Sequence, residues 1–196
     1  MPDKETKIIL ASQSPRRADL LTQVGVEFEL EPSQVQERPH SDEAPPDYII
    51  RIARAKVVAV ARKRESGLVI GADTIVVLDG RLLGKPDTQE DARQMLRQLS
   101  GKWHAVMTGV ALYDVATRRE VADYDKTLVR FAQMTEKEID WYIKSGESMD
   151  KAGSYGIQGL GGMFVEEIAG NYYNVVGLPL PLLYRLARQL GYLFVK

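Results

Sequence analysis

The apolar residues of the chain follow two spacings, and the two alternate along the sequence. Short apolar runs such as residues 68–71 end at glycine or polar residues and predict buried strands. Longer segments such as 47–64 carry apolar residues every three or four positions and predict helices with one buried face. The predicted strands cover residues 7–11, 26–30, 68–71, 75–78, 81–83, 104–113 and 121–131. The predicted helices cover residues 15–24, 47–64, 88–99, 136–144 and 179–190.

Turn and capping residues define several of these boundaries. Thr135 followed by Glu138 is a capping box at the start of a helix. Asp79-Gly80 predicts a hairpin turn between two strands. The polar Ala72-Asp73-Thr74 is expected to interrupt the apolar run and to separate two strands.

An alternation of strands and helices is typical of an α/β protein with one mixed sheet flanked by helices. A chain of 196 residues fits a single domain over residues 1–196, with two lobes sharing a cleft as the alternative. Residues 31–46 are polar and contain prolines, so we expect a loop there. The glycine-rich segment 153–162 is expected to be a loop beside a ligand or a tight turn.

Composition excludes several classes of function. The chain has no cysteine, which excludes disulfides, zinc–cysteine sites, iron–sulfur clusters and a cysteine nucleophile. Its 26 basic and 27 acidic residues lack the basic excess of a nucleic-acid-binding protein. No apolar run approaches the ~20 residues of a membrane span, and residues 2–5 are too polar for a signal peptide. We therefore expect a cytoplasmic protein that binds neither nucleic acid nor a membrane.

The first candidate for chemistry is the segment from Ser12 to Arg17, where a strand ends and a helix begins at Pro15. Unpaired N–H groups at a helix N-terminus favour an anion, and Ser12, Arg16 and Arg17 can add donors suited to phosphate. Two arginines in a first turn oppose the helix dipole, and a bound anion would explain them. A serine-capped helix with two solvated arginines is an equally open alternative.

A carboxylate, two lysines and an amide extend this candidate chemistry. Asp73 ends an apolar run and could serve as a general base or bind a metal, although capping a turn is the simpler explanation. Lys56 lies among apolar residues and either reaches solvent or faces a polyanion. Lys85 projects from backbone that the following proline keeps extended. Gln158 has the donor and the acceptor that suit the edge of a thymine or uracil base.

Seven motifs tie these segments together in order and spacing. They are Leu10-Ala11-Ser12-Gln13-Ser14-Pro15-Arg16-Arg17, Arg51-Ile52-Ala53-Arg54-Ala55-Lys56, Gly71-Ala72-Asp73-Thr74, Gly84-Lys85-Pro86, Leu99-Ser100-Gly101-Lys102, Asp150-Lys151-Ala152-Gly153 and Asn174-Val175-Val176-Gly177-Leu178-Pro179. In these motifs the chain resembles the Maf family, from about residue 8 to residue 190.

The resemblance implies a nucleoside triphosphate pyrophosphatase. The implied fold is a mixed α/β one in which two lobes enclose a deep cleft, similar to that of the inosine triphosphatases. The resemblance makes Asp73 the general base that activates water for attack on the α-phosphorus. It makes phosphate ligands of Ser12, Arg16, Arg17, Lys56 and Lys85.

The resemblance also implies a substrate. The family divides into branches that differ at three positions, occupied here by Arg16, Thr74 and Gln158. These residues match the branch that acts on dTTP and UTP and differ from the branch that acts on 7-methyl-GTP. The same chemistry on 7-methyl-GTP or on a deaminated purine nucleotide is the nearest alternative.

A divalent cation, Mg²⁺ or Mn²⁺, is implied together with the triphosphate, with Asp73 and Glu37 as ligands. The family often has an acidic pair where this chain reads Gln36-Glu37, which leaves Glu37, together with Glu43, to supply the second carboxylate. A different class of function is a nucleotide-binding regulator of septum formation that needs no catalysis, and the retained Asp73 argues against it. The apolar residues of the last helix and strand fit a homodimer surface or the core.

Overall fold

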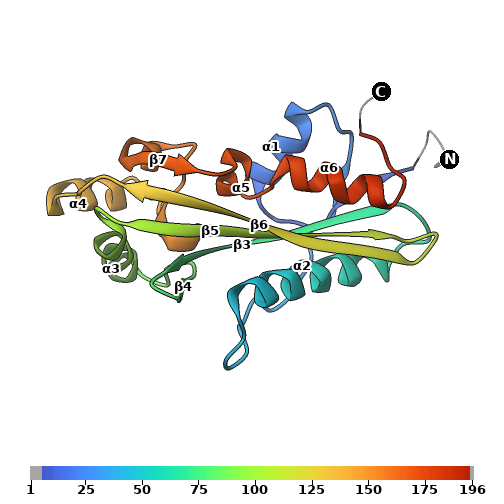
Figure 1. Ribbon diagram of the computed structural model, residues 1–196, viewed down its shortest axis with the longest axis horizontal. Helices are drawn as coiled ribbons and strands as arrows, with labels where there is room; N and C mark the ends of the chain where they lie inside the picture. The colour runs from blue at the N-terminus through green and yellow to red at the C-terminus, as the bar shows by residue number, and fades with distance from the viewer. Residues whose placement is uncertain (1–5, 195–196) are drawn as a thin grey trace. The chain divides into compact units, whose positions relative to one another are not determined.

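The computed structural model describes residues 6–194, which form strands and helices in alternation (Figure 1). The strands are β1 (Ile8–Leu10), β2 (Glu29–Leu30), β3 (Leu68–Leu78), β4 (Arg81–Leu83), β5 (Trp103–Asp114), β6 (Arg119–Phe131) and β7 (Val165–Ala169). The helices are α1 (Pro15–Gln23), α2 (Pro45–Ala61), α3 (Gln89–Leu99), α4 (Glu136–Lys144), α5 (Tyr172–Val176) and α6 (Leu180–Gln189). Two short 3₁₀ helices, η1 (Ala152–Ser154) and η2 (Leu160–Phe164), lie in the glycine-rich segment.

The seven strands of the described residues form one hydrogen-bonded sheet. Its order is β2-β1-β3-β5-β6-β7, and β4 pairs with β3. β1 is parallel to both β2 and β3, whereas β3–β4 and β6–β7 are antiparallel pairs. The predicted mixed α/β fold is therefore confirmed, and β5 and β6 are neighbours in the sheet.

Contacts divide the described residues into two compact units. Unit 1 takes in the residues up to Asp73, then Thr108–Asp125, and then the residues from Gly177 onward. Unit 2 consists of Thr74–Met107 and Lys126–Val176. Strands β3, β5 and β6 contribute residues to both units. A single domain over residues 1–196 stays a prediction.

Unit 1 has helices on both faces of its strands. Figure 1 shows α2 along one face and α1 and α6 along the other. The core between α2 and the strands is apolar and comprises Ile9, Ala11, Ala53, Val57, Val60, Ala61, Val69 and Ala111. Glycines let α2 approach the strands, because a Cβ atom on Gly71 would lie 2.8 Å from the carbonyl oxygen of Ala53. A Cβ atom on Gly109 would lie 2.6 Å from the carbonyl oxygen of Ile49.

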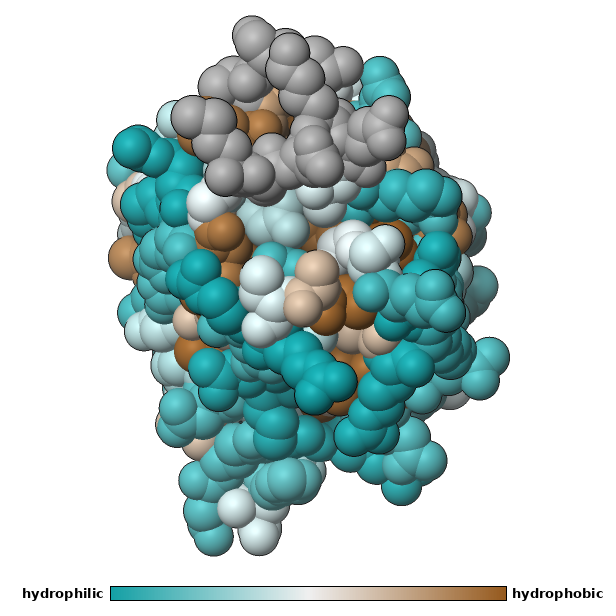
Figure 2. Space-filling model, turned by 90° about the vertical axis from the view of Figure 1, so that its right-hand side faces the viewer, coloured by the Kyte–Doolittle hydropathy of each residue, from teal (hydrophilic) through white to brown (hydrophobic). Residues whose placement is uncertain are grey.

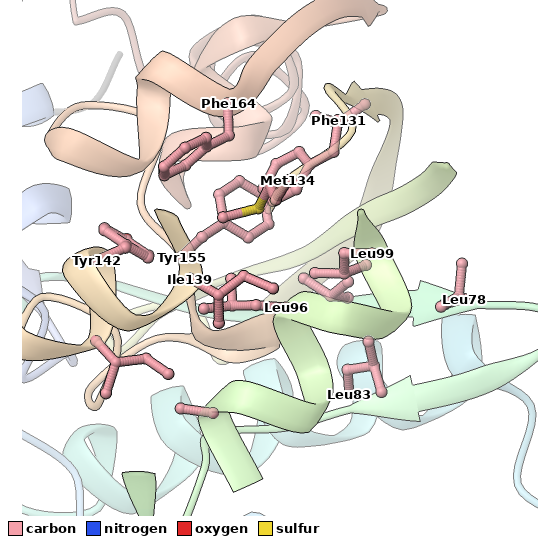
Figure 3. Packing of buried hydrophobic residues seen from close by; sticks show 14 of the residues in the cluster. Leu78, Leu83, Leu96, Leu99, Phe131, Met134, Ile139, Tyr142, Tyr155 and Phe164 are labelled. Carbon is pink, nitrogen blue, oxygen red and sulfur yellow. The ribbon is translucent and has the colours of Figure 1, made fainter. Parts of the chain in front are cut away.

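Unit 2 has a separate core of aliphatic and aromatic side chains. Figure 3 shows residues of α3, α4, β4 and β6 packed together, with Tyr155 from the glycine-rich segment and Phe164 from the end of η2. The rings of Phe131 and Tyr155 lie 4.6 Å apart between centroids in an edge contact. The predicted capping box of α4, at Thr135 and Glu138, is present. This core therefore fixes part of the segment that carries Gln158.

The structure joins two predicted strands, shortens the strand predicted at residues 26–30 to Glu29–Leu30, places the helix predicted at residues 47–64 at Pro45–Ala61, and adds two elements. Ala72-Asp73-Thr74 does not interrupt the apolar run, since β3 continues from Leu68 to Leu78. Asp73 can occupy a buried strand position because Lys56 pairs with its carboxylate. The sequence pattern predicted neither β7 nor α5. β7 has two glutamates among its five residues, so it lacks the apolar run of a buried strand. α5 is one short turn of helix, too short to show a helical spacing of apolar residues.

Polar side chains cover much of the face drawn in Figure 2. Figure 2 shows one face on which hydrophilic residues predominate and apolar side chains form scattered patches. None of the helices in residues 6–194 has both the length and the apolar character that a bilayer crossing requires.

Candidate functional site

Alternation along β3 directs Asp73 toward α2. Gly71 faces α2 closely, and Asp73, two residues further along the strand, has its side chain on the same face. Lys56 lies in α2, where its side chain is only 7% exposed, and the Asp73 side chain is 8% exposed. A glycine in the strand and a long cation in the helix thus bring two buried charges together.

The Lys56 ammonium group is surrounded by oxygen atoms. Its Nζ atom donates to Asp73 Oδ1 at 2.8 Å and to the carbonyl oxygen of Ala72 at 3.2 Å. It also pairs with Glu37 Oε1 at 2.7 Å. An ammonium group has three N–H donors, and these three acceptors match that number. Lys56 therefore holds two carboxylates around one positive charge.

The surroundings of Asp73 favour its protonated form more than water does. Burial raises the pKa of Asp73, the positive charge of Lys56 opposes that rise, and the negative charge of Glu37 adds to it. The net effect is a raised pKa. A carboxylate of raised pKa is a stronger proton acceptor than an ordinary aspartate, which suits a general base.

Glu37 belongs to the loop between β2 and α2, and Arg51 of α2 ties this loop down. Arg51 donates through Nε and Nη2 to both carboxylate oxygens of Glu43, each at 2.6 Å, and through Nη2 to the carbonyl oxygen of Arg38 at 3.0 Å. The Arg51 hydrogen bonds lower the pKa of Glu43 to about 2. Glu43 is therefore engaged by Arg51, and Glu37 is the carboxylate of the two that contacts Lys56.

Ser12 and Arg17 form a second group in unit 1. The guanidinium group of Arg17 is buried and donates to the carbonyl oxygen of Gly177 at 2.7 Å and to Ser12 Oγ at 3.0 Å. Ser12 Oγ also accepts the N–H of Ser14 at 3.1 Å, and Ser14 makes no side-chain cap for α1. Burial lowers the pKa of Arg17, whereas Asp73 and Glu37 raise it. A guanidinium remains charged in such a setting.

The remaining predicted site residues of unit 2 lie on three segments. Thr74 is half-buried in β3, and Lys85 is exposed between β4 and α3. Gln158 is exposed in the glycine-rich segment. The N–H of Gly153 donates to the carbonyl oxygen of Gly84 at 3.0 Å, so this segment is joined to the backbone next to Lys85.

The predicted site is thus resolved into groups. Asp73, Lys56 and Glu37 are in contact, and Ser12 contacts Arg17. Arg16 is half-buried in the first turn of α1. That Arg16 and the three residues of unit 2 act on the same substrate as Asp73 stays a prediction.

Sequence reasoning missed two supporting residues, Arg51 and Gly177. Arg51 anchors the loop of Glu37, and Gly177 supplies the carbonyl that accepts from Arg17. Both stand in motifs on which the family resemblance depends, but neither residue was given a role there. Their position in those motifs was the available signal.

The donors present fit a hard divalent cation shared with a substrate. Among the described residues, no group of three or more histidine, cysteine, aspartate or glutamate side chains could hold a metal by itself. Asp73 and Glu37 offer two carboxylates, which lie close together because both pair with the Lys56 ammonium group. Mg²⁺ in nucleotide sites is bound in this way, through one or two carboxylates together with substrate phosphates.

Comparison with known proteins gives relatives along nearly the whole chain. Proteins from two strains of Bacillus cereus are 50% identical over 183 residues, which is 93% of this chain and 89% and 95% of theirs. A Bacillus anthracis protein is 49% identical over the same length and 95% of its own chain. All three are named dTTP/UTP pyrophosphatase.

A solved structure, that of the Staphylococcus aureus Ham1 protein, is a distant neighbour. It has a TM-score of 0.47 and 14% identity, and the match covers 65% of this chain and 72% of that one. The family described as Maf-like protein matches residues 7–190. With a match of that extent and relatives at about half identity, the chain belongs to the Maf-like protein family.

Proposed function

We propose that the chain hydrolyses nucleoside triphosphates, dTTP and UTP above all, to the monophosphate and pyrophosphate. The observation that carries this proposal is the buried carboxylate of Asp73, held by Lys56 beside Glu37. The names of the Bacillus relatives support the choice of substrates. Free nucleoside triphosphates are cytoplasmic metabolites, so we assign the activity to the cytoplasm.

Asp73 is the general base in this reaction. Its carboxylate accepts a proton from a water molecule whose oxygen attacks the α-phosphorus. The bond from the α-phosphorus to the oxygen that bridges to the β-phosphorus breaks, and pyrophosphate leaves with the electron pair. The raised pKa of Asp73 makes the proton transfer more favourable than it would be for a solvated aspartate.

Positive charge around the phosphates provides the rest of the catalysis. Arg16, Arg17, Lys85 and the hydroxyl of Ser12 are the proposed ligands, with the N-terminus of α1. Because the Ser14 side chain does not cap that helix, its first N–H groups suit an anion. Reactions at phosphorus depend mainly on alignment and on stabilisation of charge in the transition state, and such groups supply both.

Asp73 and Glu37 would hold a divalent cation, Mg²⁺ or Mn²⁺, together with the phosphates. Such an ion neutralises charge on the triphosphate when it is bound. Lys56 keeps the two carboxylates together and so maintains the ligand pair. Base selection falls to Gln158, with Arg16 and Thr74.

A substrate panel tests the reaction. The protein is incubated with each canonical nucleoside triphosphate, 7-methyl-GTP and a deaminated purine triphosphate, with Mg²⁺ or Mn²⁺, and the products are identified. We expect monophosphate and pyrophosphate, with dTTP and UTP consumed fastest. Diphosphate and phosphate would refute the reaction, and faster turnover of 7-methyl-GTP would refute the substrate. Nucleotide binding without turnover would favour the regulatory alternative.

Asp73→Asn tests the general base. We expect turnover of dTTP to fall by ~10²-fold or more, the scale of a lost general base, while nucleotide binding is retained. Steady-state kinetics and equilibrium binding are measured in parallel. Asp79→Asn, in the exposed turn between β3 and β4, is the matched control and should keep wild-type turnover. Wild-type turnover in Asp73→Asn would show that another group accepts the proton.

A further inference from the structure

Glu147 binds the backbone two and three residues after Gln158. It follows the end of α4 and accepts the N–H of Leu160 at 2.8 Å through Oε2 and the N–H of Gly161 at 3.1 Å through Oε1. These are the first residues of η2. The carboxylate therefore engages two successive amides at the start of that short helix.

Tyr142 extends the same contact to the backbone before Gln158. Its hydroxyl donates to Glu147 Oε1 at 2.8 Å and accepts the N–H of Gly156 at 3.2 Å. The tyrosine is fully buried in α4, and its ring meets that of Phe164 edge-on, with 5.7 Å between centroids (Figure 3). A rigid core residue thus carries the hydroxyl that fixes Gly156.

Two glycines allow the segment to lie directly against these side chains. A Cβ atom on Gly159 would lie 2.2 Å from Glu147 Oε2. A Cβ atom on Gly161 would lie 2.6 Å from the Tyr142 hydroxyl and 2.8 Å from the carbonyl oxygen of Gly156. A larger residue at position 159 would displace the Glu147 carboxylate, and one at position 161 would meet both the Tyr142 hydroxyl and the backbone of Gly156. The glycines are therefore part of the contact.

Glu147 accepts these hydrogen bonds as an anion. Burial opposes its ionisation, but the amides of Gly161 and Leu160 and the hydroxyl of Tyr142 outweigh burial and lower the pKa of Glu147. Burial raises the pKa of Tyr142, so its hydroxyl keeps the proton that it donates. Hydrogen bonds to a charged acceptor are stronger than neutral ones, which makes the pair a firm anchor at neutral pH.

The anchor leaves Gln158 itself exposed while its neighbours are held. Gly156 is fixed two residues before it and Leu160 two residues after it. We propose that Glu147 and Tyr142, the Glu147–Tyr142 clamp, are positioning residues that hold Gln158 where it binds the pyrimidine base and thereby set the preference for dTTP and UTP. This inference rests on the proposed function, which gives Gln158 the base.

The test compares substrate preference among single and double variants. The preference is the ratio of kcat/KM for dTTP to that for GTP. Gln158→Ala should reduce it by ~10-fold or more, since a site built to hydrogen-bond a substrate discriminates strongly. Glu147→Gln and Tyr142→Phe should each remove a large part of the same preference, mainly through a higher KM for dTTP. In the double variant Glu147→Gln with Gln158→Ala, the preference should equal that of Gln158→Ala alone.

Hydrogen exchange supplies the structural readout. The amides of Gly156, Leu160 and Gly161 should exchange faster in Glu147→Gln than in the wild type. Glu166→Gln, which removes an exposed partner of Arg130, and Tyr172→Phe are matched controls that should change neither exchange nor preference. Thermal unfolding shows that each variant is folded, and Tyr142→Phe provides the test by itself where Glu147→Gln fails to fold.

The outcomes distinguish a failure of the Glu147–Tyr142 clamp from a failure of the proposed function. Loss of preference in Gln158→Ala but not in the folded clamp variants overturns the clamp and leaves the proposed function standing. Unchanged exchange of the three amides also overturns the clamp. An unaltered preference in Gln158→Ala overturns the assignment of the base to Gln158, and the clamp's role with it, while pyrophosphate release continues to support the reaction.

Discussion

Lys56 has more acceptors than a lysine on a helix surface usually meets. Two carboxylates and one carbonyl surround its ammonium group, and the pair with Asp73 is almost entirely buried. A buried ion pair is costly to break from one side, because the remaining charge keeps its desolvation penalty without its partner. Lys56 is therefore needed to balance the buried charge of Asp73 as well as to set the charge of the site.

Removing Lys56 alone should cost more stability than removing both charges. We expect Lys56→Met to lower the free energy of unfolding by about 3–5 kcal/mol, because Asp73 is left buried without its cation. Adding Asp73→Asn should restore much of that loss. Urea unfolding of the two single variants and the double variant measures the coupling. Lys63→Met, at an exposed position, is the control, and a strictly additive double variant would contradict the expected coupling.

The sequence predicted the residue types of the site better than their contacts. Asp73 and Lys56 were identified from their motifs, but their pairing depends on how closely α2 approaches β3. Gly71 permits that approach. The pattern of apolar and polar residues in one sequence does not indicate which helix will pack against a glycine in a strand. The partner of Arg17 is likewise a backbone carbonyl, at Gly177, which carries no side-chain signal.

At the scale of elements, the approach of α2 to the sheet depends on two glycines in different strands. Gly71 of β3 and Gly109 of β5 both face α2, and at both positions a Cβ atom would meet the helix backbone within 3 Å. Backbone cannot move aside as a flexible side chain can. Larger residues at these positions would therefore separate the helix from the strands.

Gly109→Ala should destabilise the protein by about 1–3 kcal/mol, the range for overpacking a close contact. The new methyl group would lie 2.6 Å from the carbonyl oxygen of Ile49. Chemical denaturation measures the change. Gly84→Ala is the matched control, because a Cβ atom there meets nothing within 4 Å. Equal stability of the two variants would show that α2 can shift without loss.

Elements with a strong local signal were predicted correctly, and those fixed by distant contacts were missed. The capping boxes at the start of α3 and α4 follow from neighbouring residues, and the α4 box was predicted from them. The short helix α5 has a local hydrogen bond from the N–H of Tyr173 to Asn171 Oδ1, and it is tied to the rest of unit 2 by Asn174, whose amide donates to the carbonyl oxygen of Val106 and to Thr127 Oγ1. Both partners lie more than 40 residues away, beyond any local pattern.

For the molecule as a whole, a buried histidine makes stability depend on pH. His104 is 2% exposed in unit 2, and its Nε2 atom lies 2.7 Å from the hydroxyl oxygen of Tyr155. Burial lowers the pKa of His104 from 6.5 to about 4. The unfolded chain therefore binds a proton below pH 6.5 that the folded chain takes up only near pH 4. Stability contributed by this residue is fully present above 6.5 and falls as the pH is lowered toward 4.

His104→Gln should remove this pH dependence. The full effect of the shift is about 3 kcal/mol between pH 6.5 and pH 4. We expect the unfolding free energy of the variant to decline less than that of the wild type over this interval, measured by urea denaturation at several pH values. His40→Gln, at an exposed position, should keep the wild-type slope. Parallel curves for His104→Gln and the wild type would contradict the role of the buried imidazole.

The division of the chain into interleaved segments has a consequence for how this protein can vary. Unit 2 is built from two stretches separated by Thr108–Asp125, and unit 1 from three. A chain shortened at either end therefore loses part of unit 1, and unit 2 alone would need its two stretches joined by a new linker. No uninterrupted stretch of the gene encodes either unit. Recombination by a single exchange therefore cannot swap one unit intact while leaving the other whole.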